Sequence, residues 1–473
     1  MMEYCLESDF PHYCGTFQRK RSPVHYYDVF PRVVPSDKVT QVRIRPRFSQ
    51  ADFPEASQLN VYSIPVDGEY PGASHRNYTW SEKSHQPVEW RIESGELIVS
   101  GHFAGEQEHI IVARISDSAS QQKNFERQFH IYSVADDLYE LRPLKGDFHI
   151  HSTGSDGLEC PAFVAARYRQ RGFDFIAVSD HGQYAPSLEA IEYWKPFNLD
   201  FRLYPGEEVH SPGNPVHIIN FGATRSVHSL AHDNEEQYRC EVEEIRATLP
   251  ENDRDFDNFP VAASEWVFDR IREHGGLAVF CHPYWYMMQN VICNALSDAI
   301  FKRRKFDALE VIGGFYKSQS RSNNLQVVRW VEEQAGGNRF PVVGLSDSHG
   351  TTMFTCGRDK CFTEGHDRDL FDCNFTILLA RDNSVAAISE AVREYRSVAV
   401  CRYLGELPML YGDHRMVKYS DFLLRHYFPL QTEICEIEGS LMLAHLSGDV
   451  QAKSALAALA GRAVALKQKS FGD

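Results

Sequence analysis

Histidines and carboxylates recur after short apolar segments between residues 146 and 350 of the chain. His149 and His151 are separated by one residue, and on a β-strand residues i and i+2 point to the same face. Both imidazoles can therefore reach one point, as the ligands of a metal ion must. Seven more such residues each follow a predicted strand or its turn: Asp156, His181, Glu208, His217, His282, Asp347 and His349.

The composition of this set indicates which ions it would hold. Six neutral imidazoles with three carboxylates suit Zn, Mn or Fe, whereas Mg and Ca prefer shells made of oxygen alone. Nine side chains exceed the four that a tetrahedral ion needs, so two or three divalent ions are expected. Such ions lower the pKa of a bound water and hold it as a hydroxide that can attack a phosphoester. A single histidine at a strand end is more often structural, but the placement of the whole set favours a metal site.

The elements that must position these residues alternate between short apolar strands and helices. Strands are predicted at 146–149, 175–180, 201–204, 277–282, 308–311 and 342–347, and helices at 161–171, 188–194, 263–274 and 323–334. This alternation is typical of an α/β domain with parallel strands. In barrels of this type, polar residues at the carboxyl ends of the strands carry the chemistry.

The flanking regions differ in pattern. Alternating β-branched and aromatic residues with turn signals predict an all-β, sandwich-like domain over residues 1–143. The α/β barrel is predicted at 144–405, with a last strand–helix–strand unit at 374–401, and the acidic stretch 228–260 is interpreted as an irregular loop or small insertion. Residues 406–473 form a predicted helical segment, with helices at 419–427, 432–446 and 450–469.

The order of the motifs HxH, SDG, DH, PGxE, H, HP and DxH resembles that of the PHP (polymerase and histidinol phosphatase) metallohydrolase family, over roughly Leu144 to Cys401. The resemblance implies a distorted (β/α)7 barrel with a trinuclear metal site at the carboxyl ends of its strands. It also implies that the nine residues above are the ligands. The PGxE spacing favours Glu208 over its neighbour Glu207 as the carboxylate that bridges two ions. No ligand position is missing, which indicates an active member.

Other side chains near these motifs are candidates for supporting roles. Asp180 is expected to orient His181 or a neighbour rather than to bind metal. His210, two residues after Glu208, is a candidate acid or substrate contact, and Arg321 or Lys317 could supply a further positive charge. Three aromatic residues follow the HP motif directly: Tyr284, Trp285 and Tyr286. They could either line the binding site of an organic substrate or belong to the core.

Composition restricts the classes of function. With 49 basic and 65 acidic residues the net charge is −16, which argues against an extended nucleic-acid or anionic-membrane surface. No run approaches the roughly 18 apolar residues of a membrane span, and no signal peptide is recognised at the N-terminus. Eleven cysteines without a CxxC pair favour reduced thiols in a cytoplasmic protein.

These observations predict a metal-dependent phosphoesterase acting on a small phosphorylated molecule. The alternative is a metal-dependent hydrolase of a carboxylic ester, an amide or a carbamate, because the same hydroxide attacks a carbonyl. A non-catalytic, metal-stabilised scaffold is a third hypothesis, which the complete ligand set disfavours. The β domain and the helical tail could shape the substrate pocket or form the interface of a homo-oligomer.

Overall fold

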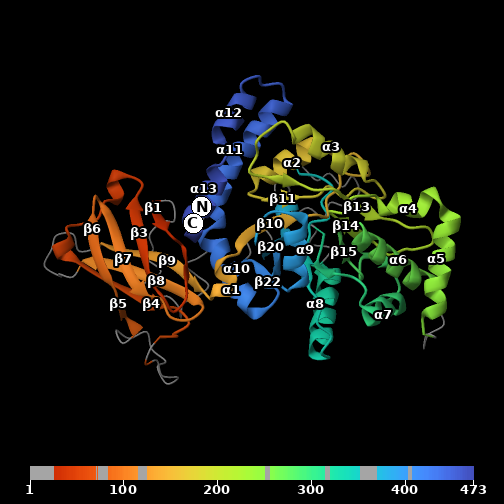
Figure 1. The fold of residues 1–473 in the computed structure, drawn as a ribbon, viewed down its shortest axis with the longest axis horizontal. Helices are drawn as coiled ribbons and strands as arrows, with labels where there is room; N and C mark the ends of the chain where they lie inside the picture. Colours follow the sequence, from red (N-terminus) through yellow and green to blue (C-terminus); the bar gives the residue numbers. More distant parts are fainter. Residues whose placement is uncertain are drawn as a thin grey trace. The chain divides into compact units, whose positions relative to one another are not determined.

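The computed structural model of the protein describes residues 26–70, 72, 84–115, 125–250, 256–314, 320–351, 370–402 and 407–472. The chain divides into two compact units (Figure 1). Unit 1 comprises residues 1–142, 418–431 and 463–473, and unit 2 comprises residues 143–417 and 432–462. The helical tail therefore contributes to both units. None of the described helices is both long enough and apolar enough to cross a membrane.

Unit 1 contains two β-sheets. The first has the order β1-β3-β7-β6, with bounds Tyr27–Phe30, Val39–Pro46, Glu96–His102 and Glu89–Glu93. The second has the order β2-β9-β8-β4-β5, with bounds Val33–Pro35, Glu126–Val134, Gln107–Ile115, Leu59–Pro65 and Gln86–Pro87. All pairings are antiparallel except that of β2 with β9. The prediction of a β-rich N-terminal region is confirmed for its described residues.

Alternation along the strands explains how these sheets pack. In β3, Val42 and Ile44 are buried while Arg43 and Arg45 are exposed, as the period of two requires. These side chains join one apolar cluster with residues of the second sheet, such as Ile111 of β8. Burying each such side chain stabilises the fold by about 1.5–3 kcal/mol.

His109 of β8 provides a test of packing in unit 1. The ring is 2% exposed and its Nε2 lies 2.9 Å from Ser133 Oγ. Burial lowers the pKa of His109 from 6.5 to about 4. The folded state therefore binds fewer protons than the unfolded state between these pH values. As the pH falls from 6.5 to 4, proton uptake by His109 in the unfolded state should lower the free energy of unfolding by up to about 3 kcal/mol.

The measurement is hydrogen exchange of the β8 and β9 amides at pH 7 and pH 4.5. The parent protein should lose more stability in acid than His109→Gln, which cannot titrate. Equal losses in the parent and in His109→Gln would show that this ring does not govern the acid response.

Unit 2 contains two larger sheets. One has the order β12-β11-β10-β20-β21-β22, with bounds Arg202–Leu203, Phe175–Ile176, Arg142–Asp147, Asn374–Ala380, Ser397–Cys401 and Met409–Tyr411. The other has the order β13-β14-β15-β18-β19, with bounds Gly206–Val209, Ile218–Phe221, Leu277–Phe280, Ala308–Ile312 and Val342–Gly344. A small hairpin, β16 (Tyr286–Met287) with β17 (Gln289–Asn290), follows β15. Strand β14 is antiparallel to both of its neighbours.

Two isolated parallel bridges connect these sheets at the carboxyl ends of their strands. Ile150, after β10, pairs with Ser348, after β19, and His181, after β11, pairs with Glu208 in β13. Backbone hydrogen bonds accompany them, such as that from the amide of His151 to the carbonyl of Ser348 at 2.8 Å. The segments that carry the histidine motifs therefore meet at one edge of both sheets.

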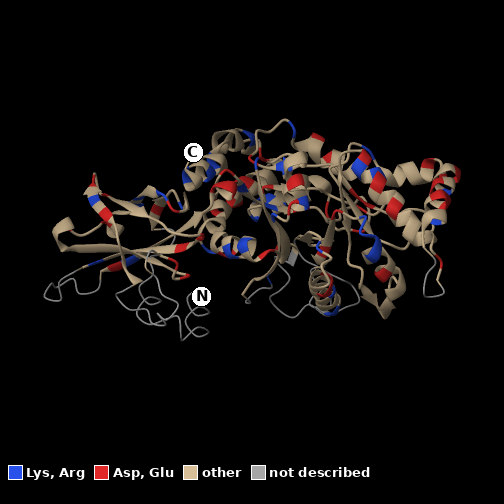
Figure 2. Ribbon diagram, turned by 60° about the horizontal axis from the view of Figure 1, so that its bottom comes forward, with Lys and Arg blue, Asp and Glu red and all other residues tan. Residues whose placement is uncertain are grey.

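Helices accompany these strands along the chain of unit 2 (Figure 1). They are α2 (Pro161–Gln170), α3 (Ala185–Trp194), α4 (Val227–Asp233), α5 (Glu235–Thr248), α6 (Phe259–Glu273), α7 (Asn294–Arg303), α8 (Ser320–Ala335) and α9 (Val385–Arg393). The predicted helices correspond to α2, α3, α6 and α8, so the prediction of a mixed α/β protein is confirmed. Acidic and basic residues are interspersed over the described ribbon (Figure 2).

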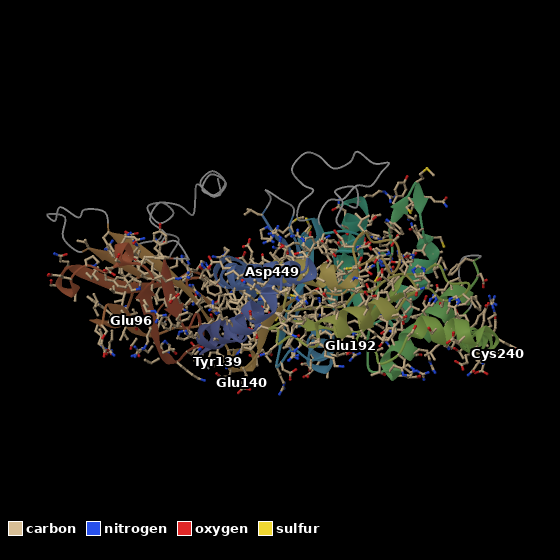
Figure 3. The ribbon with its side chains drawn as sticks, turned by 90° about the horizontal axis from the view of Figure 1, so that it is seen from above. Glu96, Tyr139, Glu140, Glu192, Cys240 and Asp449 are labelled. Carbon is tan, nitrogen blue, oxygen red and sulfur yellow. The ribbon has the colours of Figure 1, made fainter. Side chains whose placement is uncertain are left out.

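The expectation of an irregular stretch at 228–260 is wrong, because α4 and α5 occupy most of it. Although this stretch is acidic, Tyr238 and Val242 lie one turn apart and are both buried, as on one face of a helix. The side chain of Asn234 accepts a hydrogen bond from the amide of Gln237 and caps α5. Cys240 lies on its exposed side (Figure 3).

The tail is helical, as predicted, except for the short strand β22. Helices α10 (His414–His426) and α11 (Phe428–Leu446) start earlier than expected. The single helix expected at 450–469 is two helices, α12 (Ala452–Leu459) and α13 (Arg462–Phe471). The break lies at Gly461, whose φ of 82° a helix does not allow. Its amide donates a hydrogen bond to Asp200 Oδ1 at 3.1 Å.

Candidate metal centre

The HxH pair after β10 points into the region where the two sheets of unit 2 meet. His149 and His151 are at most 1% exposed, and their ring centroids lie 5.3 Å apart. Both Nε2 atoms approach Asp347 Oδ1, at 3.3 Å from His149 and 3.0 Å from His151. Each also lies 3.7 Å from an oxygen of Glu208. The two imidazoles thus converge on two carboxylates that come from other strands.

Glu208 is the centre of the cluster. Its Oε1 lies 2.7 Å from His217 Nδ1 and 3.8 Å from His282 Nε2. Its Oε2 lies 2.5 Å from His181 Nδ1. Since the two oxygens face different histidines, this carboxylate can contribute to two ligand sets at once.

Asp156 lies near three histidine rings at the exposed side of the cluster. Its Oδ1 lies 3.4 Å from His349 Nε2, 3.6 Å from His181 Nε2 and 3.9 Å from His151 Nδ1. Its side chain is 58% exposed, whereas Glu208 is fully buried. All nine residues singled out in the sequence are therefore brought into one cluster, and their role as metal ligands stays a prediction.

The chemistry of the cluster fits divalent cations. His149 Nε2 and both carboxylate oxygens of Glu208 are buried and make no hydrogen bond with the described residues. Ring nitrogens also face one another, as in the 2.9 Å approach of His282 Nε2 to His217 Nδ1. Among the described residues, the recorded ion-pair partners of Asp156, Glu208 and Asp347 are all histidines. An arrangement of this kind without a cation would leave buried charge uncompensated.

The ionisation of the carboxylates suits metal binding. Burial alone would raise the pKa of Glu208, but the charges of His217 and His149 hold it well below its ordinary value. The pKa of Asp347 is likewise lowered against the effect of burial, by His149 and by the hydrogen bond with His151. Burial lowers the pKa of His151 to about 4. At neutral pH Glu208 and Asp347 are thus ionised and His151 is neutral. Against the effect of burial, nearby carboxylates raise the pKa of His149, His181, His282 and His349, so an ion that binds these rings must displace protons.

The backbone is strained at two members of the cluster. His282 has a φ of 24° and Asp347 a φ of 50°, values that residues with a Cβ rarely adopt. Each lies shortly after a strand, β15 or β19, and each side chain turns into the cluster. Strain of this kind is concentrated at functional sites, where the surrounding structure maintains it.

Sequence reasoning missed Glu310. The carboxylate of this β18 residue is fully buried, and its two oxygens contact His149 Nδ1 at 2.7 Å and His282 Nδ1 at 3.2 Å. The available signal was a lone acidic residue inside the apolar segment Ala308–Ile312. Charged residues are almost never fully buried unless they are paired.

Asp180 supports the loop that carries Asp156. Its carboxylate accepts hydrogen bonds from the amide of Ser152 at 2.7 Å, from Ser152 Oγ at 2.5 Å and from Ser155 Oγ at 2.6 Å. These contacts fix the turn immediately before Asp156. Asp180 therefore orients a neighbouring loop rather than the ring of His181.

The remaining candidates lie at different distances from the cluster. His210 Nε2 is 2.9 Å from His181 Nδ1, and the His210 side chain is 37% exposed. Arg321 is exposed, lies over the ring of Tyr286 and donates a hydrogen bond to Asn290 Oδ1. The structure thus brings His210 to the cluster, whereas Arg321, at the start of α8, contacts the β16–β17 hairpin. Lys317 lies outside the described residues.

The three aromatic residues after the HP motif have separate surroundings. Tyr284 is buried in the apolar core of unit 2, and Tyr286 is 45% exposed. Only Trp285 borders the cluster, with its ring centroid 5.7 Å from that of His217 and 5.4 Å from that of His282.

A second group of metal-ligating side chains, in unit 1, does not fit a metal ion. Glu108, His130 and His426 lie close together. The guanidinium of Arg425 donates to both oxygens of Glu108, at 3.3 and 2.7 Å, and to His426 Nε2 at 2.8 Å. Arg425 therefore already supplies the positive charge that an ion would bring, and it uses the same lone pairs.

Comparison with known proteins places these features in context. No protein-family profile matches the chain. A segment of 103 residues is 28% identical to the DNA polymerase/3'-5' exonuclease PolX of Bacillus subtilis, and it covers 22% of this chain but only 18% of that protein.

Two solved structures share 18% sequence identity with the chain. One is a two-domain protein of Bacteroides vulgatus that contains a predicted PHP-like metal-dependent phosphoesterase; 60% of this chain and 71% of that chain align with a TM-score of 0.40. The other is a proposed metal-dependent phosphoesterase of Bifidobacterium adolescentis, with 47% and 92% aligned and a TM-score of 0.31. The chain resembles the PHP metallohydrolases. This confirms the resemblance predicted from the motifs.

Proposed function

We propose that the protein is a metal-dependent phosphoesterase that cleaves a small phosphorylated molecule. The convergence of six histidines with Asp156, Glu208 and Asp347 in one cluster, with the carboxylate of Glu208 buried at its centre, supports this proposal. A site with this ligand chemistry needs cations, and cations attract an anionic substrate to a protein of net charge −16.

We further propose that unit 2 is a distorted (β/α)7 barrel. The two bridges, Ile150 with Ser348 and His181 with Glu208, support a closed ring in the order β10, β11, β13, β14, β15, β18 and β19. The antiparallel β14 accounts for the distortion. In such a barrel the ligands would lie at the carboxyl ends of the parallel strands, and His217 would lie at the same edge because it precedes the antiparallel β14.

Three groups within the cluster favour three ions of Zn, Mn or Fe. One group would be His149, His151 and Asp347, a second His217 and His282, and a third Asp156, His181 and His349. Glu208 would be shared between groups, since its oxygens lie closest to His217 and His181. These sets mix imidazole with carboxylate, a mixture that suits the three metals. Bound ions would lower the pKa of a coordinated water and neutralise the charge of the phosphoester.

The chain's own residues complete the site. His210 is partly exposed at the edge of the cluster, so its ring can approach a bound substrate and donate a proton to the departing alcohol. Trp285 offers a flat apolar surface beside His217 and His282. The organic part of the substrate would pack there, while its phosphate lies towards the cluster.

The deciding experiment compares hydrolysis of p-nitrophenyl phosphate, bis(p-nitrophenyl) phosphate and p-nitrophenyl acetate by protein loaded with zinc, manganese or iron. Turnover of a phosphate with little of the acetate is expected. Cleavage of the acetate alone would overturn the phosphoesterase in favour of a carboxylic ester, amide or carbamate hydrolase. Metal binding without hydrolysis of any of the three would favour the scaffold.

A further inference from the structure

Glu310 is a buried acidic side chain that none of the roles above uses. It lies in the middle of β18 between Leu309 and Val311, and all five residues of that strand are buried. Gln326 of α8 donates hydrogen bonds to the backbone carbonyls of Glu310 and Val311, both at 3.1 Å. A Cβ atom at Gly313 would overlap the carboxylate. The position of Glu310 is therefore closely constrained from several sides.

The two oxygens of Glu310 contact two different histidines of the cluster on the same ring atom. Oε2 lies 2.7 Å from His149 Nδ1, and Oε1 lies 3.2 Å from His282 Nδ1. The Nε2 atoms of the same rings face the cluster. His149 Nε2 is 3.3 Å from Asp347 Oδ1, and His282 Nε2 is 3.8 Å from Glu208 Oε1.

We propose that Glu310 is a positioning residue that fixes the tautomer of both rings and so prepares two different metal positions with one carboxylate. An ionised carboxylate only accepts hydrogen bonds, so both histidines must carry their proton on Nδ1. The lone pair of each Nε2 is then left for an ion. This inference rests on the proposed metal centre, and it adds a residue that links two of the three ligand groups.

Glu310→Gln tests the proposal because an amide has one acceptor oxygen and one donor nitrogen. The amide can accept from only one ring. The other ring must then present its Nδ1 lone pair to the amide and carry its proton on Nε2, where it cannot bind a metal ion. We expect the dissociation constant of one zinc ion to rise about 10–100-fold while the others change little.

The measurement is calorimetric titration of the metal-free parent and variants with zinc, with metal content checked by mass spectrometry. Glu265→Gln is the matched control, because Glu265 is also buried and is paired with Arg303 of α7, remote from the cluster in its contacts. It should bind zinc as the parent does. Parent-like zinc binding by Glu310→Gln would overturn the proposal.

A second measurement needs no substitution at Glu310. ¹⁵N NMR of the zinc-loaded parent should show His149 and His282 with their proton on Nδ1, with resonances assigned from His149→Gln and His282→Gln. A proton on Nε2 of either ring would overturn the proposal even if Glu310→Gln does not fold. Absence of zinc, manganese and iron binding by the parent would instead refute the metal centre itself, so the two failures are distinguishable.

Discussion

Replacing Glu208 with Gln is expected to lower turnover by at least about 100-fold and to reduce the metal content of the protein. Both oxygens of this carboxylate are buried, and they face His217 and His181 at 2.7 and 2.5 Å. The amide keeps the size of the side chain but removes the negative charge and replaces one oxygen by a nitrogen without a lone pair. Metal analysis and turnover under saturating substrate measure the effect.

The adjacent Glu207 provides the control, since Glu207→Gln removes the same charge one residue away. Glu207 accepts hydrogen bonds from Ser226 Oγ at 2.6 Å, Asn220 Nδ2 at 3.0 Å and the amide of Val227 at 2.5 Å, at the start of α4. Glu207→Gln should therefore lower the melting temperature and leave the metal content unchanged. A loss of metal in Glu207→Gln with a silent Glu208→Gln would shift the assignment by one residue. If both variants are silent, metal-dependent hydrolysis at this cluster is refuted.

The second large effect is expected at Arg169 in unit 2. This fully buried guanidinium donates to Glu438 Oε2 at 2.6 and 2.9 Å and to the carbonyl of Phe173 at 2.9 Å. It thereby connects α2 with α11. Arg169→Met should lower the free energy of unfolding by about 3–5 kcal/mol, because it leaves the carboxylate of Glu438 buried without its partner. Urea denaturation followed through unit 2 measures this loss.

Two further variants distinguish the effect of breaking a buried ion pair from the general effect of replacing an arginine. Arg246→Met removes an exposed partner of Glu243 and should cost less than about 1 kcal/mol. The double variant Arg169→Met with Glu438→Met removes both charges and should be more stable than Arg169→Met alone. A double variant as unstable as the sum of both single changes would show that the two side chains act independently.

The cluster could be predicted from the sequence because most of its members follow strands, although Glu208 lies within β13 and His217 precedes β14. The spacing of His149 and His151 places both rings on one face, and the other ligand candidates follow later strands whose ends meet. Glu310 could not be assigned in this way, because its role depends on contacts with His149 and His282, more than 25 residues away in the chain. Nothing in its local sequence shows which side chains lie opposite.

The helices of the stretch 228–260 were missed for a different reason. Its many acidic residues suggested a solvated loop, whereas Tyr238 and Val242 already supply the apolar face of α5. The division of the tail at Gly461 depends on a hydrogen bond to Asp200, a residue far away in the sequence. Local patterns thus predicted many of the helices and strands but not α4, α5 or α7, and they did not give all of the bounds.

The Arg425 guanidinium makes the charge balance around Glu108 in unit 1 independent of bound ions. A positive charge that belongs to the polypeptide cannot dissociate, so the charge balance around Glu108 is established once the chain has folded. The carboxylates at the centre of unit 2 have histidines as partners, and in the proposed metal centre their countercharge would come from ions taken up from the medium. Under the proposed function, the supply of divalent metal ions would therefore control the activity of unit 2, whereas the charge balance around Glu108 in unit 1 would not depend on it.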